Sequence, residues 1–201
     1  MSSPFTPNVG ASLCPRATPG RPYRHAGYDI MVARQIFKAM GLTWREPAGR
    51  YNHVRMVTHS SMYQDGNAEH ALIGVSEFSD RIGCEESFLS VGDGPFDVYD
   101  WADGLPPTIE QDETLNDWWR NHIGEPYGYI KYGRMLYRAL VGCRDWTKLR
   151  LIEGGFVCSS SWATAWEKAG RRLYPQLDAS IITPHLLIAG LELKAENWRV
   201  P

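Results

Sequence analysis

The spacing of the apolar residues changes near residue 101, and this change constrains the fold more than any other feature. Before it, segments 51–58 and 96–101 alternate in the manner of strands, and the apolar segment 71–78 is a third strand. After it, apolar residues such as Leu115 and Trp118 recur at helical spacing. Strands followed by helices are typical of α+β domains, so we predict an antiparallel sheet packed against helices.

The remaining elements are predicted from local signals. Residues 28–32 (YDIMV) form a short strand that leads into a helix over 33–40, and Asp65-Gly66-Asn67 is a strong turn. A helix starts at Thr108, with Leu115, Trp118, Trp119 and Ile123 on its apolar face. Later helices cover 133–141, 159–168 and, as a short closing helix, 185–193.

The length of 201 residues and the hydrophobic fraction of 43% fit one domain with a substantial core. Residues 1–21 are rich in Pro, Ser and Gly, so we expect a flexible leader there and a single domain over 22–201. No apolar run is long enough for a transmembrane segment, and we see no signal peptide. We therefore expect a cytoplasmic protein. The net charge of −2 gives no indication of nucleic acid or of an anionic membrane surface as a partner.

Four cysteines lie at positions 14, 84, 143 and 158, without a CxxC pair or the spacing of a zinc site, and we expect neither a metal nor a cofactor. Cys158 differs from the others because it follows Gly154-Gly155 and opens the predicted helix. The dipole of a helix favours a thiolate at its N-terminus. The alternative is that Cys158 is a small core residue at a strand-to-helix junction.

A nucleophilic thiol needs a base, and the base needs a group that orients it. Among six histidines, His53 is the best candidate because it lies within a predicted apolar strand. Glu77, near the end of the following strand, would lie beside it in a hairpin and hold the imidazole. His70 is the alternative third residue, and an ordinary solvent-facing role for Glu77 stays open.

The order of the motifs resembles one enzyme group. Gly-Tyr-Asp-Ile-Met-Val (27–32), Tyr-Asn-His-Val (51–54), Glu77, Gly-Glu-Pro-Tyr-Gly-Tyr (124–129), Phe-Val-Cys-Ser-Ser (156–160) and Ile-Thr-Pro-His-Leu-Leu (182–187) follow one another. This series is similar to the circularly permuted papain-like cysteine hydrolases of the NlpC superfamily, which include the YiiX-like and lecithin retinol acyltransferase-like proteins. In that group the histidine strand precedes the cysteine helix.

The resemblance implies a papain-like antiparallel sheet or half-barrel packed against helices, with the nucleophile at a helix N-terminus. It assigns Cys158 as nucleophile, His53 as base and Glu77 as third residue, and places Tyr127 near the groove. The sequence departs from the group where Tyr28 separates Gly27 from Asp29. It also departs at Arg55, where small residues are common, so Arg55 is a candidate to shape the groove or bind an acidic substrate group.

These residues predict a thiol hydrolase that acts through an acyl-enzyme on an amide bond. The resemblance favours a cell-wall-type peptide as substrate. A bacteriophage-borne, virion-associated enzyme would reconcile that substrate with the missing signal peptide. A lipid amidase, acyltransferase or thioesterase of the same fold is the second interpretation. The third is a non-catalytic structural or binding module of a larger assembly, with Trp-rich contact surfaces.

Overall fold

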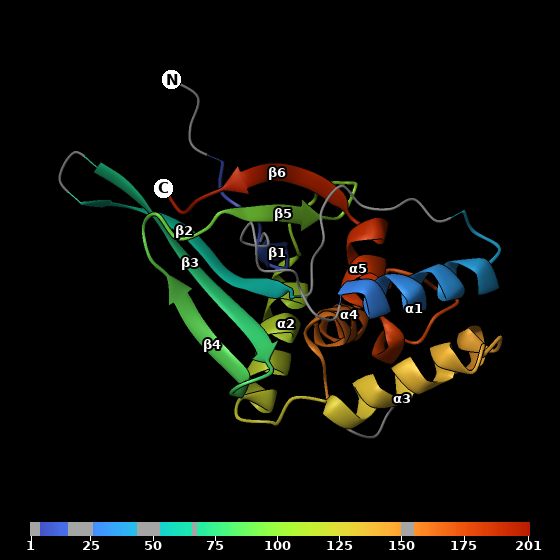
Figure 1. Ribbon diagram of the computed structural model, residues 1–201. Coiled ribbons are helices and arrows are strands. Elements are labelled where there is room, and N and C mark those ends of the chain that lie inside the picture. The colour runs from blue at the N-terminus through green and yellow to red at the C-terminus, as the bar shows by residue number, and fades with distance from the viewer. Residues whose placement is uncertain (1–4, 16–25, 44–52, 66–67, 150–154) are drawn as a thin grey trace.

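The computed structural model describes residues 5–15, 26–43, 53–65, 68–149 and 155–201 of the chain (Figure 1). The strands are β1 (Ser12–Pro15), β2 (Arg55–Asp65), β3 (Ala68–Ser79), β4 (Gly83–Leu89), β5 (Phe96–Asp100) and β6 (Glu192–Trp198). The α-helices are α1 (Ala26–Ala39), α2 (Ile109–His122), α3 (Tyr129–Leu140), α4 (Cys158–Lys168) and α5 (Pro184–Gly190). Two short 3-10 helices cover Trp146–Lys148 and Ala179–Ile181.

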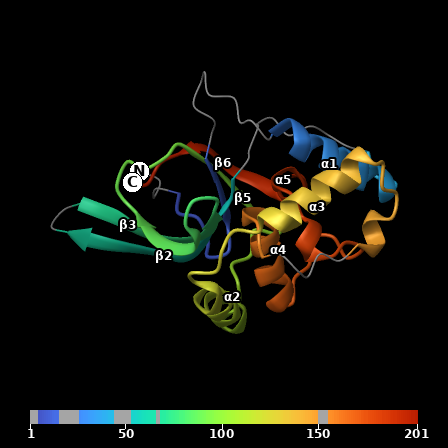
Figure 2. The same ribbon diagram turned by 60° about the horizontal axis from the view of Figure 1, so that its bottom comes forward.

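The described strands form one sheet in the order β4-β3-β2-β1-β5-β6, and every neighbouring pair is antiparallel. The helices α1, α3, α4 and α5 gather beside this sheet, and α2 lies below it (Figures 1 and 2). The predicted α+β class, with an antiparallel sheet packed against helices, is therefore confirmed.

The face of the sheet turned away from the helices carries its own apolar cluster. Residues from all six strands contribute, including Leu89 at one edge and Trp198 at the other. The segment after β4 meets the C-terminus, where Gly92 N–H donates to the Val200 carbonyl and Val200 N–H donates to the Asp93 carbonyl. These bonds draw the two edges of the sheet toward each other and shield the cluster between them.

The expectation of a flexible leader over residues 1–21 is wrong for its described part, residues 5–15. Strand β1 lies inside the sheet between β2 and β5, and Ser12, Leu13 and Cys14 are fully buried. The four residues of β1 are too few to show the alternation that predicts a strand. Their conformation is decided by pairing with two strands that are distant in the sequence. The rest of the predicted leader lies outside the described residues.

The predicted strand over 28–32 is also wrong, because these residues belong to α1. The buried residues Val32, Ala33, Ile36 and Phe37 recur at four-residue spacing, so they form one apolar stripe on a helix. A short apolar run fits a strand or a helix equally well, and here the helical pattern that follows it extends backward.

Three further differences concern element ends and sheet edges. The predicted closing helix over 185–193 ends at Gly190, and β6 follows it as an edge strand. Strand β4 at the other edge was not predicted, since edge strands tolerate polar residues such as Glu85 and Glu86. Ile123 follows the last residue of α2 and is exposed, whereas Leu115, Trp118 and Trp119 are buried as predicted.

Helix α2 starts where the sequence predicts because Thr108 caps it. The Thr108 hydroxyl accepts from the Gln111 backbone N–H, and the Gln111 side chain accepts from the Thr108 backbone N–H. This reciprocal pair satisfies two donors that have no partner inside the helix. Helix α4 begins one residue earlier than predicted, at Cys158 itself.

Two tryptophans of α4 hold the N-terminal segment against the core. The indole N–H groups of Trp162 and Trp166 each donate to the Gly10 carbonyl at 3.1 Å. Gly10 adopts a φ of 81°, and an added Cβ would lie 2.2 Å from Cζ2 of Trp166. Glycine is therefore required at this position for both its backbone conformation and its lack of a side chain.

We expect Gly10→Ala to lower the free energy of unfolding by about 3 kcal/mol, since it adds a clash in the core to the cost of a positive φ. Gly41→Ala is the matched control, because Gly41 has a φ of 72° with open space around its Cα. The control should lose only roughly 1 kcal/mol. Urea denaturation of the three proteins measures both values, and equal losses would show that the segment before β1 is not tightly packed.

Candidate active site

Cys158 is the first residue of α4, and this helix is buried on almost every side. Its serines accommodate burial by bonding to carbonyls: Ser159 Oγ donates to the Ile182 carbonyl at 2.7 Å and Ser161 Oγ to the Cys158 carbonyl at 2.7 Å. Ser160 Oγ accepts from the Val157 backbone N–H at 3.2 Å. The hydroxyls thus satisfy buried polar groups and fix the first turn of the helix.

An aromatic cluster holds the segment just before Cys158. The ring of Phe156 packs against Phe78, Trp118 and His122, with centroid separations of 5.6, 5.2 and 5.3 Å. On another side the ammonium of Lys131 lies 4.7 Å from the centroid of the Phe156 ring. Burial lowers the pKa of Lys131 to about 8, although the charge of Asp178 acts in the opposite direction.

Residues 124–128 join the sheet to this segment. Cys84 in β4 exchanges backbone bonds with Gly124 and Glu125, and Gly128 N–H donates to the Phe156 carbonyl at 2.7 Å. Tyr127 and Phe156 form a short parallel bridge. The link from β4 through Tyr127 to Phe156 therefore sets Cys158 beside the strands that carry its partners.

Strands β2 and β3 supply the other polar groups. Met56 pairs with Ser76, so Arg55 and Glu77 are neighbours across the two strands. Arg55 Nε lies 2.9 Å from Glu77 Oε1, and the Nε2 atom of His53 is hydrogen-bonded to Glu77 Oε2. Glu77 is only 5% exposed, so both of its carboxylate oxygens face charged or polar groups inside the protein.

Cys158 and Glu77 both act on His53, and this row of three groups determines its ionisation. Burial lowers the pKa of His53, but the bonds and charges of Cys158 and Glu77 outweigh this and raise it to about 10. Burial would likewise raise the pKa of Glu77, yet the hydrogen bond from His53 and the charge of Arg55 lower it. The groups around His53 therefore favour its protonated form, the imidazolium.

These groups face a cavity of about 480 Å³. That volume lies within the range of small-molecule and peptide pockets. Part of the lining comes from the β3–β4 turn and part from residues 127–135, which include the start of α3. Its lining includes all five residues predicted from the sequence, which are Cys158, His53, Glu77, Tyr127 and Arg55.

The structure thus brings the predicted nucleophile, base and third residue together, and it does not bring His70 to them. His70 pairs with Tyr63 in the distal part of the β2–β3 hairpin, and their rings lie 5.4 Å apart. Glu77 lies seven positions after His70, which is about 23 Å along the strand. The prediction that His53 lies within a strand is wrong, since β2 begins two residues later at Arg55.

Several cavity residues were not predicted, notably Tyr129, Tyr132 and Met135 on α3 and Thr183 before α5. The spacing of the α3 residues could have indicated a shared lining, because positions 129 and 132 lie on one side of a helix. Thr183 was also recognisable as a helix cap, and its Oγ1 accepts from the Leu186 backbone N–H at 3.2 Å. The Ser79–Ile82 turn had no such signal.

Chemically, the site combines a thiol, an imidazole and a carboxylate at a helix N-terminus. The first N–H groups of a helix have no intrahelical partner, so those of α4 are suited to stabilise negative charge near Cys158. Among the described residues, no group of three or more His, Cys, Asp and Glu side chains is arranged to hold a metal ion. None of the described helices is both long and apolar enough to span a membrane.

Comparison with known proteins adds no assignment. A scan against protein-family models gives no match, and a search of curated proteins finds no significant similarity. The inference about function therefore depends on the geometry of the site and on the resemblance of its motifs.

We expect the imidazole of His53 to titrate far above the ordinary value of 6.5, with a midpoint near 10. Histidine-selective NMR across a pH series measures this midpoint. Cys158→Ala and Glu77→Gln should each lower it, because each removes a group that stabilises the imidazolium. A midpoint near 6.5 in the wild type would contradict the proposed row of bonds.

The same shift has a consequence for stability. The pKa of His53 is higher in the folded than in the unfolded chain, so its contribution is fully present below pH 6.5 and is lost as the pH rises through about 10. The difference in free energy of unfolding between wild type and His53→Gln should therefore shrink from neutral to alkaline pH. A difference that grows would show the opposite linkage.

Proposed function

We propose that this protein is a cysteine hydrolase that forms an acyl-enzyme on Cys158. The observation that carries the proposal is the grouping of Cys158, His53 and Glu77 at the wall of a 480 Å³ cavity, with His53 hydrogen-bonded to Glu77. Nucleophile, base and orienting group in that relation are the requirement for thiol catalysis. The position of Cys158 at the start of α4 supports the same function.

In the proposed reaction, the thiolate of Cys158 attacks the carbonyl carbon of the substrate and a C–S bond forms. The resulting oxyanion is stabilised by the backbone N–H of Cys158 and the N-terminus of α4. The His53 imidazolium gives its proton to the leaving nitrogen as the C–N bond breaks. Water then attacks the thioester, His53 takes a proton from it, and the released acid leaves Cys158 as a thiolate.

Glu77 and Arg55 act on His53 rather than on the substrate. Glu77 fixes the orientation of the imidazole and stabilises its charge, and Arg55 holds the second oxygen of Glu77. The expectation that Arg55 binds an acidic substrate group is therefore secondary to this role. Its side chain is 28% exposed and lines the cavity, so contact with a substrate is compatible with the ion pair.

For the substrate, we propose the amide bond of a cell-wall-type peptide, following the resemblance of the motifs. An acyl lipid is the second candidate, and one observation favours it: Tyr127, Tyr129, Tyr132 and Met135 give the cavity a largely apolar wall. Zymography on peptidoglycan and an assay with lipid esters and amides separate the two candidates. The non-catalytic alternative predicts no turnover in either assay.

We expect Cys158 to be alkylated by iodoacetamide at mildly acidic pH faster than the other three cysteines, because it lies beside the His53 imidazolium and at the N-terminus of α4. Burial raises the pKa of Cys14 and of Cys84, the latter to about 12. Cys143, which is partly exposed, is therefore the appropriate internal control. Peptide mass spectrometry measures the rates, and a Cys158 rate unaffected by His53→Ala would sink the thiolate assignment.

We expect Cys158→Ala to lower turnover of the responding substrate by at least about a thousand-fold. Glu77→Gln should lower it by about a hundred-fold or more, because the imidazole loses its orienting carboxylate. Cys143→Ala is the control and should retain wild-type turnover. A substrate panel assayed with these variants gives the test, and full activity of Cys158→Ala would exclude the acyl-enzyme mechanism.

A further inference from the structure

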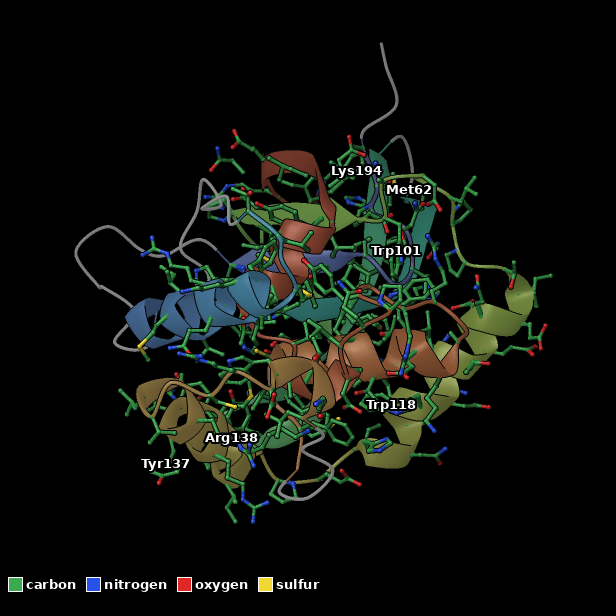
Figure 3. The ribbon with its side chains drawn as sticks, turned by 90° about the vertical axis from the view of Figure 1, so that its right-hand side faces the viewer. Met62, Trp101, Trp118, Tyr137, Arg138 and Lys194 are labelled. Carbon is green, nitrogen blue, oxygen red and sulfur yellow. The ribbon has the colours of Figure 1, made fainter. Side chains whose placement is uncertain are left out.

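Helix α3 exposes apolar side chains along its outer face. Tyr129, Ile130, Tyr137, Leu140 and the C-cap residue Val141 are each between 59% and 66% exposed. The opposite face is buried through Lys131, Met135 and Ala139. Figure 3 shows Tyr137 and Arg138 on the outer side of α3, directed away from the rest of the molecule. One helix therefore has an apolar inner face and a second, unburied apolar stripe.

The stripe is ordered along the helix, because Ile130, Tyr137 and Val141 follow one another at intervals of seven and four residues. Arg134 and Arg138 are exposed along one side of it. An aromatic and aliphatic stripe bordered by cations is the pattern of helices that lie in the plane of a lipid interface. Tyrosine is favoured there because its ring is apolar and its hydroxyl is polar.

Charge is distributed unevenly over the molecule despite the net value of −2. The exposed charged residues of segment 129–149 are four bases and one acid, namely Arg134, Arg138, Arg144 and Lys148 against Asp145. The exposed charged residues of α2 are instead mainly acidic, namely Glu110, Glu113 and Asp117 against Arg120. The net charge of the whole chain therefore does not describe the surface of α3, which is basic.

The stripe continues to the mouth of the cavity. Tyr129 belongs both to the exposed stripe and to the cavity lining, and its hydroxyl donates to the Asp80 carbonyl at 2.5 Å. Beside it, Arg81 and Ile82 are exposed and also line the cavity. A flat partner that covers α3 would thus reach the opening of the candidate active site.

We propose that α3 and its flanking residues form a docking surface for an anionic lipid bilayer. Its apolar side chains are Ile82, Tyr129, Ile130, Tyr137, Leu140 and Val141, and its cations are Arg138, Arg144 and Lys148. A second copy of the chain fits less well, since a symmetric contact would oppose the same cations. An anionic surface neutralises them and accepts the apolar side chains together. This binding does not depend on the proposed hydrolase activity.

Vesicle cosedimentation of the full chain tests the proposal, with vesicles of equimolar phosphatidylglycerol and phosphatidylcholine against phosphatidylcholine alone. We expect binding to the anionic vesicles that weakens at high ionic strength. Arg138→Glu/Lys148→Glu should reduce partitioning by at least about ten-fold, since each cation near such a surface contributes substantially. Tyr137→Ser/Val141→Ser should also reduce it, because those residues supply apolar contact.

Arg120→Glu/Lys168→Glu is the matched control, because it changes the net charge equally at exposed sites on α2 and α4. The control should bind anionic vesicles nearly as the wild type does, and circular dichroism verifies that each variant is folded. Absence of wild-type binding, or equal losses in the control and in the α3 variants, overturns the proposal. A wild-type dimer that Tyr137→Ser/Val141→Ser converts to a monomer would assign this surface to self-association instead.

Discussion

The burial of α4 between the sheet and the other helices is the constraint on which the candidate site depends. A helix buried on almost every side must have small residues where neighbours approach closely, and α4 has three serines before Trp162 and two alanines between Trp162 and Trp166. The serine hydroxyls bond to backbone carbonyls, so a rotation of the helix would leave polar groups unsatisfied in the core. One orientation is therefore strongly favoured, and in it Cys158 meets His53.

The polar groups opposite Cys158 depend on the register of the sheet in the same way. Because side chains alternate along a strand, a shift of one residue between β2 and β3 would turn Glu77 to the other face. The bulge between Val57 and His59 fixes that register, and Gly74 admits the ring of Phe88 and the side chain of His59 above it. Burying Glu77 is costly alone, and His53 and Arg55 offset the cost only in this arrangement.

Chemistry-bearing residues were more predictable than the backbone that positions them. The site residues followed from what a thiol nucleophile requires, and α2 followed from its cap at Thr108, because both depend on local residue type. Strand β1 was not predictable, since four residues become a strand only through pairing with β2 and β5. The prediction of His53 beside Glu77 did not depend on its strand assignment, which was wrong. His53 lies two residues before β2 and is still hydrogen-bonded to Glu77.

Helix α3 connects the site with the outer surface. Its inner side places Met135 and Tyr132 in the cavity wall and Lys131 over the ring of Phe156, which precedes Cys158. Gln35 Nε2 donates to the Ala139 carbonyl at 2.8 Å and ties α3 to α1. Because the inner face is fixed in this way, the outer stripe has a fixed direction relative to the cavity mouth. A surface bound to the stripe would therefore meet the cavity opening in a single orientation.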